Sequence, residues 1–178
     1  MNLIIDIGNT ACKLAVFEQG EIRETLRCSN QSLEGISALC ERYPIRKGIL
    51  SSVISISEEI RQQLNQLPFP VMEFTSKTPV PIKNLYETPQ TLGVDRLAAV
   101  VAAFTQKPYC PALVIDAGTC ITYDFIDELG QYQGGNISPG MDMRFKALHT
   151  FTDKLPLVNV YGPTPDYGKS YSGYCRDL

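Results

Sequence analysis

Two short stretches of the chain run from apolar residues into an aspartate and then turn through glycine and small polar residues. The first is LIIDIGNT, which begins at Leu3, and the second is LVIDAGT, which ends at Thr119. A turn of this composition exposes successive backbone N–H groups, and the side chains of Asn9 and Thr10 complete a small cradle for phosphate oxygens. A carboxylate at Asp6 suits Mg²⁺, or a metal-bound water that bridges to the phosphates.

Two further residues of the first stretch fit the same interpretation. Gly8 permits the backbone to approach a ligand closely, because it has no side chain. Lys13 follows Thr10 by three residues and supplies positive charge if it faces the cleft. The alternative is an ordinary hairpin in which Asp6 is a cap.

The second stretch repeats the first without a gap. The aligned pairs are Leu3 with Leu113, Ile5 with Ile115, Asp6 with Asp116, and Gly8 with Gly118. Each copy is followed by a strand, a glycine-containing turn, a third strand and a helix, which indicates a duplicated fold with a cleft between its halves. Two facing hairpins, the second offering the hydroxyl and N–H of Thr119, would position a polyphosphate for phosphoryl transfer. Chance similarity of two apolar strands is the alternative.

The tetrapeptide GVDR, residues 93–96, lies where a long loop meets a predicted helix. Asp95 is a candidate general base for a hydroxyl proton, and Arg96 a candidate bidentate partner for a substrate carboxylate. Equally, Asp95 could cap the helix and Arg96 could be a surface charge. The glycine-rich GGNISPG, residues 134–140, is compatible with a ligand contact, a subunit contact or a turn. His149 is interpreted as structural, since it has no recognisable triad partners.

Secondary-structure elements that would position these residues follow from periodicity and turn signals. Strands are predicted over 2–8, 12–28 (two strands with a turn at 18–21), 47–54, 70–74, 112–118, 120–127 and 132–138. Helices are predicted over 32–43 with Ser32 as N-cap, over 57–67 starting at Ser57, and over 93–106 and 140–155. The proline-rich segment 75–96 is predicted to be a long functional loop.

Composition limits the function classes. The 178 residues suit one large domain or two small ones, and 44% of them are hydrophobic. A net charge of −3 gives no general attraction to nucleic acid or to an anionic membrane. The six cysteines form no metal-binding pattern. No apolar run approaches the roughly 18–20 residues of a membrane helix, so we expect a cytoplasmic protein.

Taken together, DIGNT at Asp6, GVDR at Gly93, DAGT at Asp116 and GGNISPG at Gly134 resemble, in order and spacing, the motifs of type III pantothenate kinase. This bacterial family is part of the superfamily of acetate and sugar kinases, heat-shock-70 proteins and actin. The resemblance implies an α/β fold of two ribonuclease-H-like (actin-like ATPase) domains, each a mixed sheet flanked by helices, with the active cleft between them. It also implies ATP-dependent phosphorylation of pantothenate to 4′-phosphopantothenate, the first step of coenzyme A biosynthesis.

The resemblance further assigns roles to individual residues. It places ATP phosphates on the first motif and on Thr119, with Asp6 near Mg²⁺; the first motif comprises Asp6, Ile7, Gly8, Asn9, Thr10, Ala11, Cys12 and Lys13. It makes Asp95 the catalytic base and Asp116 a ligand of a monovalent cation, K⁺ or NH₄⁺. Pantothenate would contact Tyr86, Gly93, Val94, Asp95 and Arg96. Family members are homodimers with the active site at the subunit interface.

The resemblance also leads to an expected domain division, 1–92 and 93–178. The family continues with a Gly-Lys-Asn/Ser-Thr segment, whose threonine reaches pantothenate across the dimer. In this chain YGKS, from Tyr167, begins that segment, and Tyr171 occupies the expected threonine position. Because few residues remain after it, we expect the second domain to be truncated at its C-terminus.

Two other functions remain compatible with the sequence. One is a kinase of the same superfamily for another small hydroxylated substrate. The other is a non-catalytic, nucleotide-binding accessory or regulatory protein that keeps the fold.

Overall fold

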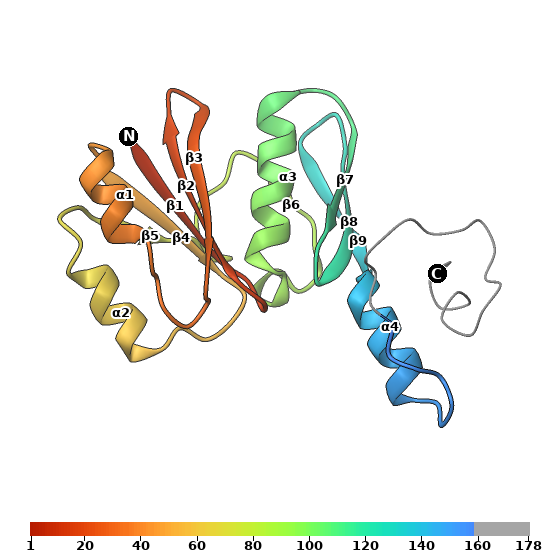
Figure 1. The fold of residues 1–178 in the computed structure, drawn as a ribbon. Helices are drawn as coiled ribbons and strands as arrows, with labels where there is room; N and C mark the ends of the chain where they lie inside the picture. The colour runs from red at the N-terminus through yellow and green to blue at the C-terminus, as the bar shows by residue number, and fades with distance from the viewer. Residues whose placement is uncertain (159–178) are drawn as a thin grey trace.

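A computed structural model describes residues 1–158 and shows two β-sheets with a helix between them (Figure 1). The first sheet has the strand order β3-β2-β1-β4-β5. Strands β1, β2 and β3 are antiparallel, whereas β4 and β5 run parallel to β1. The five strands are β1 (Asn2–Ile7), β2 (Cys12–Glu18), β3 (Glu21–Cys28), β4 (Lys47–Ser52) and β5 (Val71–Glu73).

One face of the first sheet forms the main hydrophobic core. Alternation along β1 places Leu3, Ile5 and Ile7 on this face, and all three side chains are fully buried. Helices α1 (Ile36–Arg42) and α2 (Glu58–Asn65) cover it. Because the period of a strand is two residues, the same alternation turns Ile4 and Asp6 to the opposite face, toward the second half of the molecule.

The second sheet has the strand order β6-β9-β8-β7. Strands β7, β8 and β9 are antiparallel, and the short β6 runs parallel to β9. Its elements are β6 (Lys83–Asn84), β7 (Ala112–Ala117), β8 (Cys120–Ile126) and β9 (Gln131–Pro139), followed by α4 (Met141–Thr150). The order β9-β8-β7 repeats the order β3-β2-β1, so the predicted duplication is present in the topology.

Helix α3 (Val94–Gln106) lies between the two sheets (Figure 1). Leu97 and Val100 pack with Ile126 and Tyr132 of the second sheet in a smaller buried cluster. The far face of this sheet is open within residues 1–158, where Leu113, Ile115 and Phe125 are exposed. No helix among the described residues is both long and apolar enough to cross a membrane.

Three details differ from the sequence-based expectations. Helix α1 starts at Ile36, because Gly35 before it has a positive φ of 96° that interrupts the helical path. The predicted N-cap Ser32 was therefore wrong, and its hydroxyl donates to Glu34 instead. Ser57, in contrast, caps α2 as predicted by accepting from the Ile60 N–H. Helix α4 ends at Thr150, earlier than predicted.

The third detail concerns the proline-rich loop. This loop contains strand β6 and a 3-10 turn, η1 (Pro89–Thr91). Phe74, Val80 and Ile82 pack in the core cluster of the second sheet. Part of the loop before residue 93 therefore packs with the second sheet.

Candidate active site

The two predicted phosphate hairpins meet in the structure. The hydroxyl of Thr10 lies 2.9 Å from that of Thr119, although the two residues are 109 positions apart in the sequence. Both side chains are exposed. The turns thus face each other from different sheets, as a site that holds one ligand from both sides requires.

The first hairpin is closed and supported by backbone contacts. The Gly8 N–H donates to the Ala11 carbonyl at 3.0 Å. Asn30, after β3, donates its side-chain amide to the carbonyls of Gly8 and Asn9, at 3.1 and 2.9 Å. These bonds engage the carbonyl groups of the turn. The N–H groups of Asn9 and Thr10 are the donors of the turn that suit an anion.

The second hairpin is supported by the last glycine of GGNISPG. Gly118 N–H donates to the Cys120 carbonyl at 2.9 Å, and Gly140 N–H donates to the Thr119 carbonyl at 3.1 Å. A Cβ on Gly140 would collide with the carbonyls of Gly118 and Thr119. In the structure, the motif ends in a turn at Gly140, and the backbone of this turn lies close against the second hairpin and supports it.

The carboxylates of Asp95 and Asp116 are near enough to act electrostatically on Asp6, but the described residues hold no cluster of three acidic, histidine or cysteine side chains that could bind a metal ion. Burial raises the pKa of Asp6, and the negative charges of Asp95 and Asp116 raise it further, whereas Lys13 lowers it. Lys13 is the direct partner of Asp6 across β1 and β2. Ser51, paired with Asp6 across β1 and β4, has a buried hydroxyl beside this carboxylate, and it also lowers the pKa of Asp6. A cation beside Asp6 would offset the repulsion between the negative charges of Asp6, Asp95 and Asp116.

Asp95 lies in the first turn of α3, where the N-cap is Gly93. Asp95 is therefore not the cap. Its Oδ1 accepts the backbone N–H of Arg96 at 2.8 Å, and a Cβ on Gly93 would lie 2.5 Å from the same oxygen. The side chain is half-buried.

Arg96 is buried and paired, rather than a surface charge. Its Nε and Nη2 donate to the Asp124 carboxylate at 3.0 and 2.6 Å, and its Nη2 also donates to the Tyr132 hydroxyl at 3.2 Å. The ring of Tyr86 stacks on Tyr132 with 6.2 Å between centroids. The guanidinium carbon lies 5.9 Å from the centre of the Tyr86 ring. Tyr86 and Arg96, both expected at the substrate, thus lie together.

The remaining predicted residues are divided between the core and the surface. Ile7 and Cys12 are fully buried, so only their backbone is available to a ligand. Ala11 and Val94 are half-buried, and Lys13 is exposed. Tyr171 and the segment from Tyr167 lie outside the described residues.

Sequence reasoning missed Asn30, Ser51 and Asp124. Asn30 and Ser51 carry no local signal, because only the fold brings them to Gly8 and Asp6. Asp124 did carry a local signal, because an acidic residue at an inward-facing position of a predicted strand requires a cationic partner.

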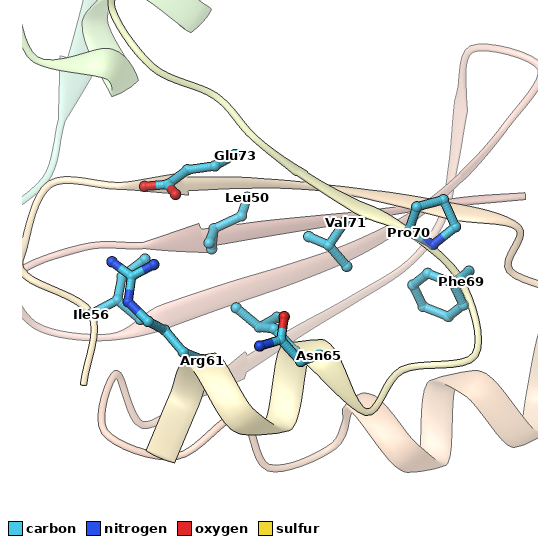
Figure 2. Close-up of a pocket in the computed structure, with 9 residues that line it drawn as sticks. Leu50, Ile56, Arg61, Asn65, Phe69, Pro70, Val71 and Glu73 are labelled. Carbon is cyan, nitrogen blue, oxygen red and sulfur yellow. The ribbon is translucent and has the colours of Figure 1, made fainter. Parts of the chain in front are cut away.

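A separate cavity of about 270 Å³ lies between α2 and strands β4 and β5 (Figure 2). Arg61 and Glu73 lie toward one end of it, and Phe69 and Pro70 toward the other. None of the predicted site residues lines it. The hairpins and α3, not this cavity, are therefore the candidate active site.

Comparison with known proteins decides the family. The profile of the type III pantothenate kinase family matches residues 2–173. The chain belongs to the type III pantothenate kinase family. Its fold is α/β, with two mixed sheets flanked by helices, and it is a member of a family of kinases.

Relatives in this family are close in sequence. A type III pantothenate kinase of Phocaeicola vulgatus is 62% identical over 170 residues, which cover 96% of this chain and 70% of that protein. One of Bacteroides fragilis is 59% identical over 169 residues, covering 95% and 70%. The chain thus spans about 70% of the length of these relatives.

A solved structure agrees on the fold. A protein of the Baf family of transcriptional activators from Campylobacter jejuni superposes with a TM-score of 0.57 at 19% identity, over 98% of this chain and 72% of that one. At this identity the likeness concerns the fold alone.

Proposed function

We propose that this chain transfers the γ-phosphoryl group of ATP to the terminal hydroxyl of pantothenate, yielding ADP and 4′-phosphopantothenate in the first step of coenzyme A biosynthesis. Family membership supports the substrate pair. The observation that carries the proposal is the 2.9 Å contact between Thr10 and Thr119, which joins the two phosphate hairpins beside a set of carboxylates.

The hairpins bind and orient the polyphosphate. The backbone N–H groups of Asn9 and Thr10 in the first turn and of Thr119 in the second, with the two threonine hydroxyls, donate to the phosphate oxygens. Lys13 adds positive charge near the first turn. Phosphoryl transfer depends mainly on such positioning and charge stabilisation, so little covalent chemistry is required of the protein.

Asp95 is the proposed general base. The pantothenate hydroxyl oxygen forms the new bond to the γ-phosphorus while the bond to the β–γ bridging oxygen breaks, and Asp95 takes the hydroxyl proton. The Arg96 N–H bond at 2.8 Å fixes one carboxylate oxygen and leaves the other free to accept this proton. The α3 segment Gly93–Arg96, together with Tyr86, forms the proposed pantothenate site.

The acids next to the hairpins suit metal ions. Asp6, with the Ser51 hydroxyl beside it on β4, would hold Mg²⁺ directly or through water. Asp116, an exposed carboxylate at the end of β7, would hold K⁺ or NH₄⁺. When bound, these cations neutralise phosphate charge. The homodimer implied by the family resemblance and the cytoplasmic location expected from the sequence are part of this proposal.

A coupled ADP-release assay tests the proposal. With ATP, Mg²⁺ and K⁺ present, we expect ADP release that depends on added pantothenate. Binding of ATP without release, with pantothenate or other small hydroxylated compounds, would overturn it in favour of a non-catalytic nucleotide-binding protein. Release with another hydroxylated acceptor, but not with pantothenate, would indicate a different kinase of this fold.

A further inference from the structure

The Arg96–Asp124 pair is the most deeply buried ion pair among the described residues. The two side chains are 6% and 1% exposed. Asp124 accepts Arg96 Nε and Nη2, and it accepts the Tyr132 hydroxyl at 2.6 Å. Burial alone lowers the pKa of Arg96, but the hydrogen bonds and charge of Asp124, with Tyr132 and Tyr86, outweigh it and raise the pKa. The guanidinium is thus charged and fixed in one orientation.

This pair connects β8 to the start of α3. Arg96 is the residue after Asp95, and its backbone N–H is the group that holds the Asp95 carboxylate. Anchoring the Arg96 side chain to Asp124 therefore fixes the helix turn from which Asp95 projects. The same anchor orders Tyr86, whose ring lies over both Arg96 and Tyr132.

The neighbouring backbone is built around the pair. A Cβ on Gly135 of β9 would lie 2.6 Å from Asp124 Oδ1 and 2.8 Å from Arg96 Nη2, and it would also collide with the Tyr123 carbonyl. Only glycine leaves room for the pair at this point. The first part of GGNISPG thus accommodates the Arg96–Asp124 pair, while its last glycine supports the second hairpin.

Stability gives little reason for a buried ion pair here. Removing two charges from water costs about as much as their attraction returns, and apolar residues of the same volume often stabilise a protein as well. A pair next to a candidate base and a candidate substrate residue is better explained by orientation.

We propose that Asp124 is a positioning residue for the reaction: through Arg96 and Tyr132 it orients Asp95 and Tyr86 at the pantothenate end of the site. This inference rests on the proposed function. Asp124 itself touches neither substrate; it acts by holding groups that do.

The test compares Asp124→Asn and Tyr132→Phe with two matched controls. Asn keeps the shape of Asp124 but removes its charge, and Phe keeps the stacked ring of Tyr132 but removes its hydroxyl. The controls are Asp127→Asn, in the turn after β8, and Tyr123→Phe, on β8 but on its opposite face. Steady-state kinetics are measured for both substrates at a temperature where each variant is shown to be folded.

We expect Asp124→Asn to lower kcat/KM for pantothenate by about 100-fold, because small misplacements of reacting groups have effects of this size. Tyr132→Phe, which keeps the ion pair, should lower it by about 10-fold, in line with the loss of the two hydrogen bonds of the Tyr132 hydroxyl. The KM for ATP should stay within about twofold of the parent value, and both controls should match the parent. A KM for ATP that rises as much as the KM for pantothenate, or no loss of kcat/KM for pantothenate in folded Asp124→Asn, would overturn the inference.

A second readout does not require turnover. In ¹H–¹⁵N NMR spectra of the parent chain we expect a slowly exchanging Arg96 Nε–H signal. Asp124→Asn should remove it and shift the Arg96 backbone amide that contacts Asp95. If the parent fails to phosphorylate pantothenate but shows these changes, the proposed function falls and the positioning of Asp95 stands. Unchanged Arg96 signals in Asp124→Asn would overturn the positioning itself.

Discussion

The three aspartates of the candidate site have different surroundings, and their proposed roles follow from these. Asp6 is half-buried with a raised pKa, Asp95 is held by a helix N–H, and Asp116 is exposed at a strand end. A metal-bound carboxylate benefits from burial among other acids, whereas a base for a hydroxyl proton needs a fixed and accessible oxygen. These different environments are the reason for proposing Asp6 as a metal ligand and Asp95 as the base.

Replacement of Asp95 tests the role of the base. We expect Asp95→Asn to lower kcat by about 10²–10⁴-fold, since an amide cannot accept the proton, while ATP affinity is unchanged. Steady-state kinetics and ATP titration measure both quantities. Asp142→Asn, which changes the corresponding first-turn acid of α4, is the matched control. Activity of Asp95→Asn near the parent level would exclude Asp95 as the base.

The raised pKa of Asp6 predicts how stability depends on pH. Because the folded-state pKa lies above the ordinary value of 3.8, ionised Asp6 lowers the free energy of unfolding. This cost grows as the pH rises from 3.8 through the folded-state pKa, and it is fully present above that pKa. We therefore expect Asp6→Asn to melt at a higher temperature than the parent at pH 7 and to bind ATP with Mg²⁺ more weakly. Thermal melts over a pH series measure the first effect; a lower melting temperature at pH 7 would contradict it.

At the scale of elements, each hairpin depends on a polar group that is distant in sequence. Asn30 holds the first turn from the loop after β3, and Gly140 holds the second from the end of β9. A phosphate-binding turn that must keep its N–H groups pointing at the ligand gains from such external support.

Removal of the Asn30 amide should loosen the first hairpin. We expect Asn30→Ala to raise the KM for ATP by about tenfold, equivalent to one or two net hydrogen bonds. The melting temperature should fall by only about 2–4 °C, because the turn is at the surface. Asn65→Ala on α2, at the cavity of Figure 2, is the control and should leave the KM for ATP unchanged. A raised KM for ATP in Asn65→Ala, with an unchanged KM in Asn30→Ala, would place the nucleotide at that cavity.

The sequence predicted the strands and both hairpins, because alternating apolar residues and the Asp-x-Gly pattern are local signals. It did not predict the two-residue strand β6, which exists only through its pairing with β9. It left the Arg96 partner unidentified, since Asp124 is 28 residues away on another element. The start of α1 was misplaced because the unusual φ of Gly35 has no side-chain signature.

At the scale of the whole molecule, the two copies of the fold are supported unequally within residues 1–158. Strand β1 has neighbours on both edges, whereas β7, at the end of its sheet, pairs only with β8. Leu3 and Ile5 are fully buried, while their counterparts Leu113 and Ile115 are 60% and 56% exposed. The hairpin of Thr119 therefore projects from the less enclosed sheet.

This difference predicts unequal local stability. Hydrogen exchange followed by mass spectrometry should show β1 amides exchanging at least about tenfold more slowly than β7 amides, because fewer buried contacts oppose local opening of β7. Bound ATP should reduce the difference in amide exchange rate between β1 and β7 if it contacts both hairpins. Equal exchange of the two strands without ATP would contradict the prediction.

The central claim is that both hairpins and Asp95 form one site for phosphoryl transfer to pantothenate. Phosphorus NMR of a reaction with ATP, Mg²⁺, K⁺ and pantothenate tests it most directly, because it identifies the product. We expect the ATP γ-phosphate signal to be replaced by a phosphate monoester on the terminal hydroxyl of pantothenate, and no such signal with Asp95→Asn. Inorganic phosphate as the only new product, or an unchanged ATP spectrum, would contradict the account.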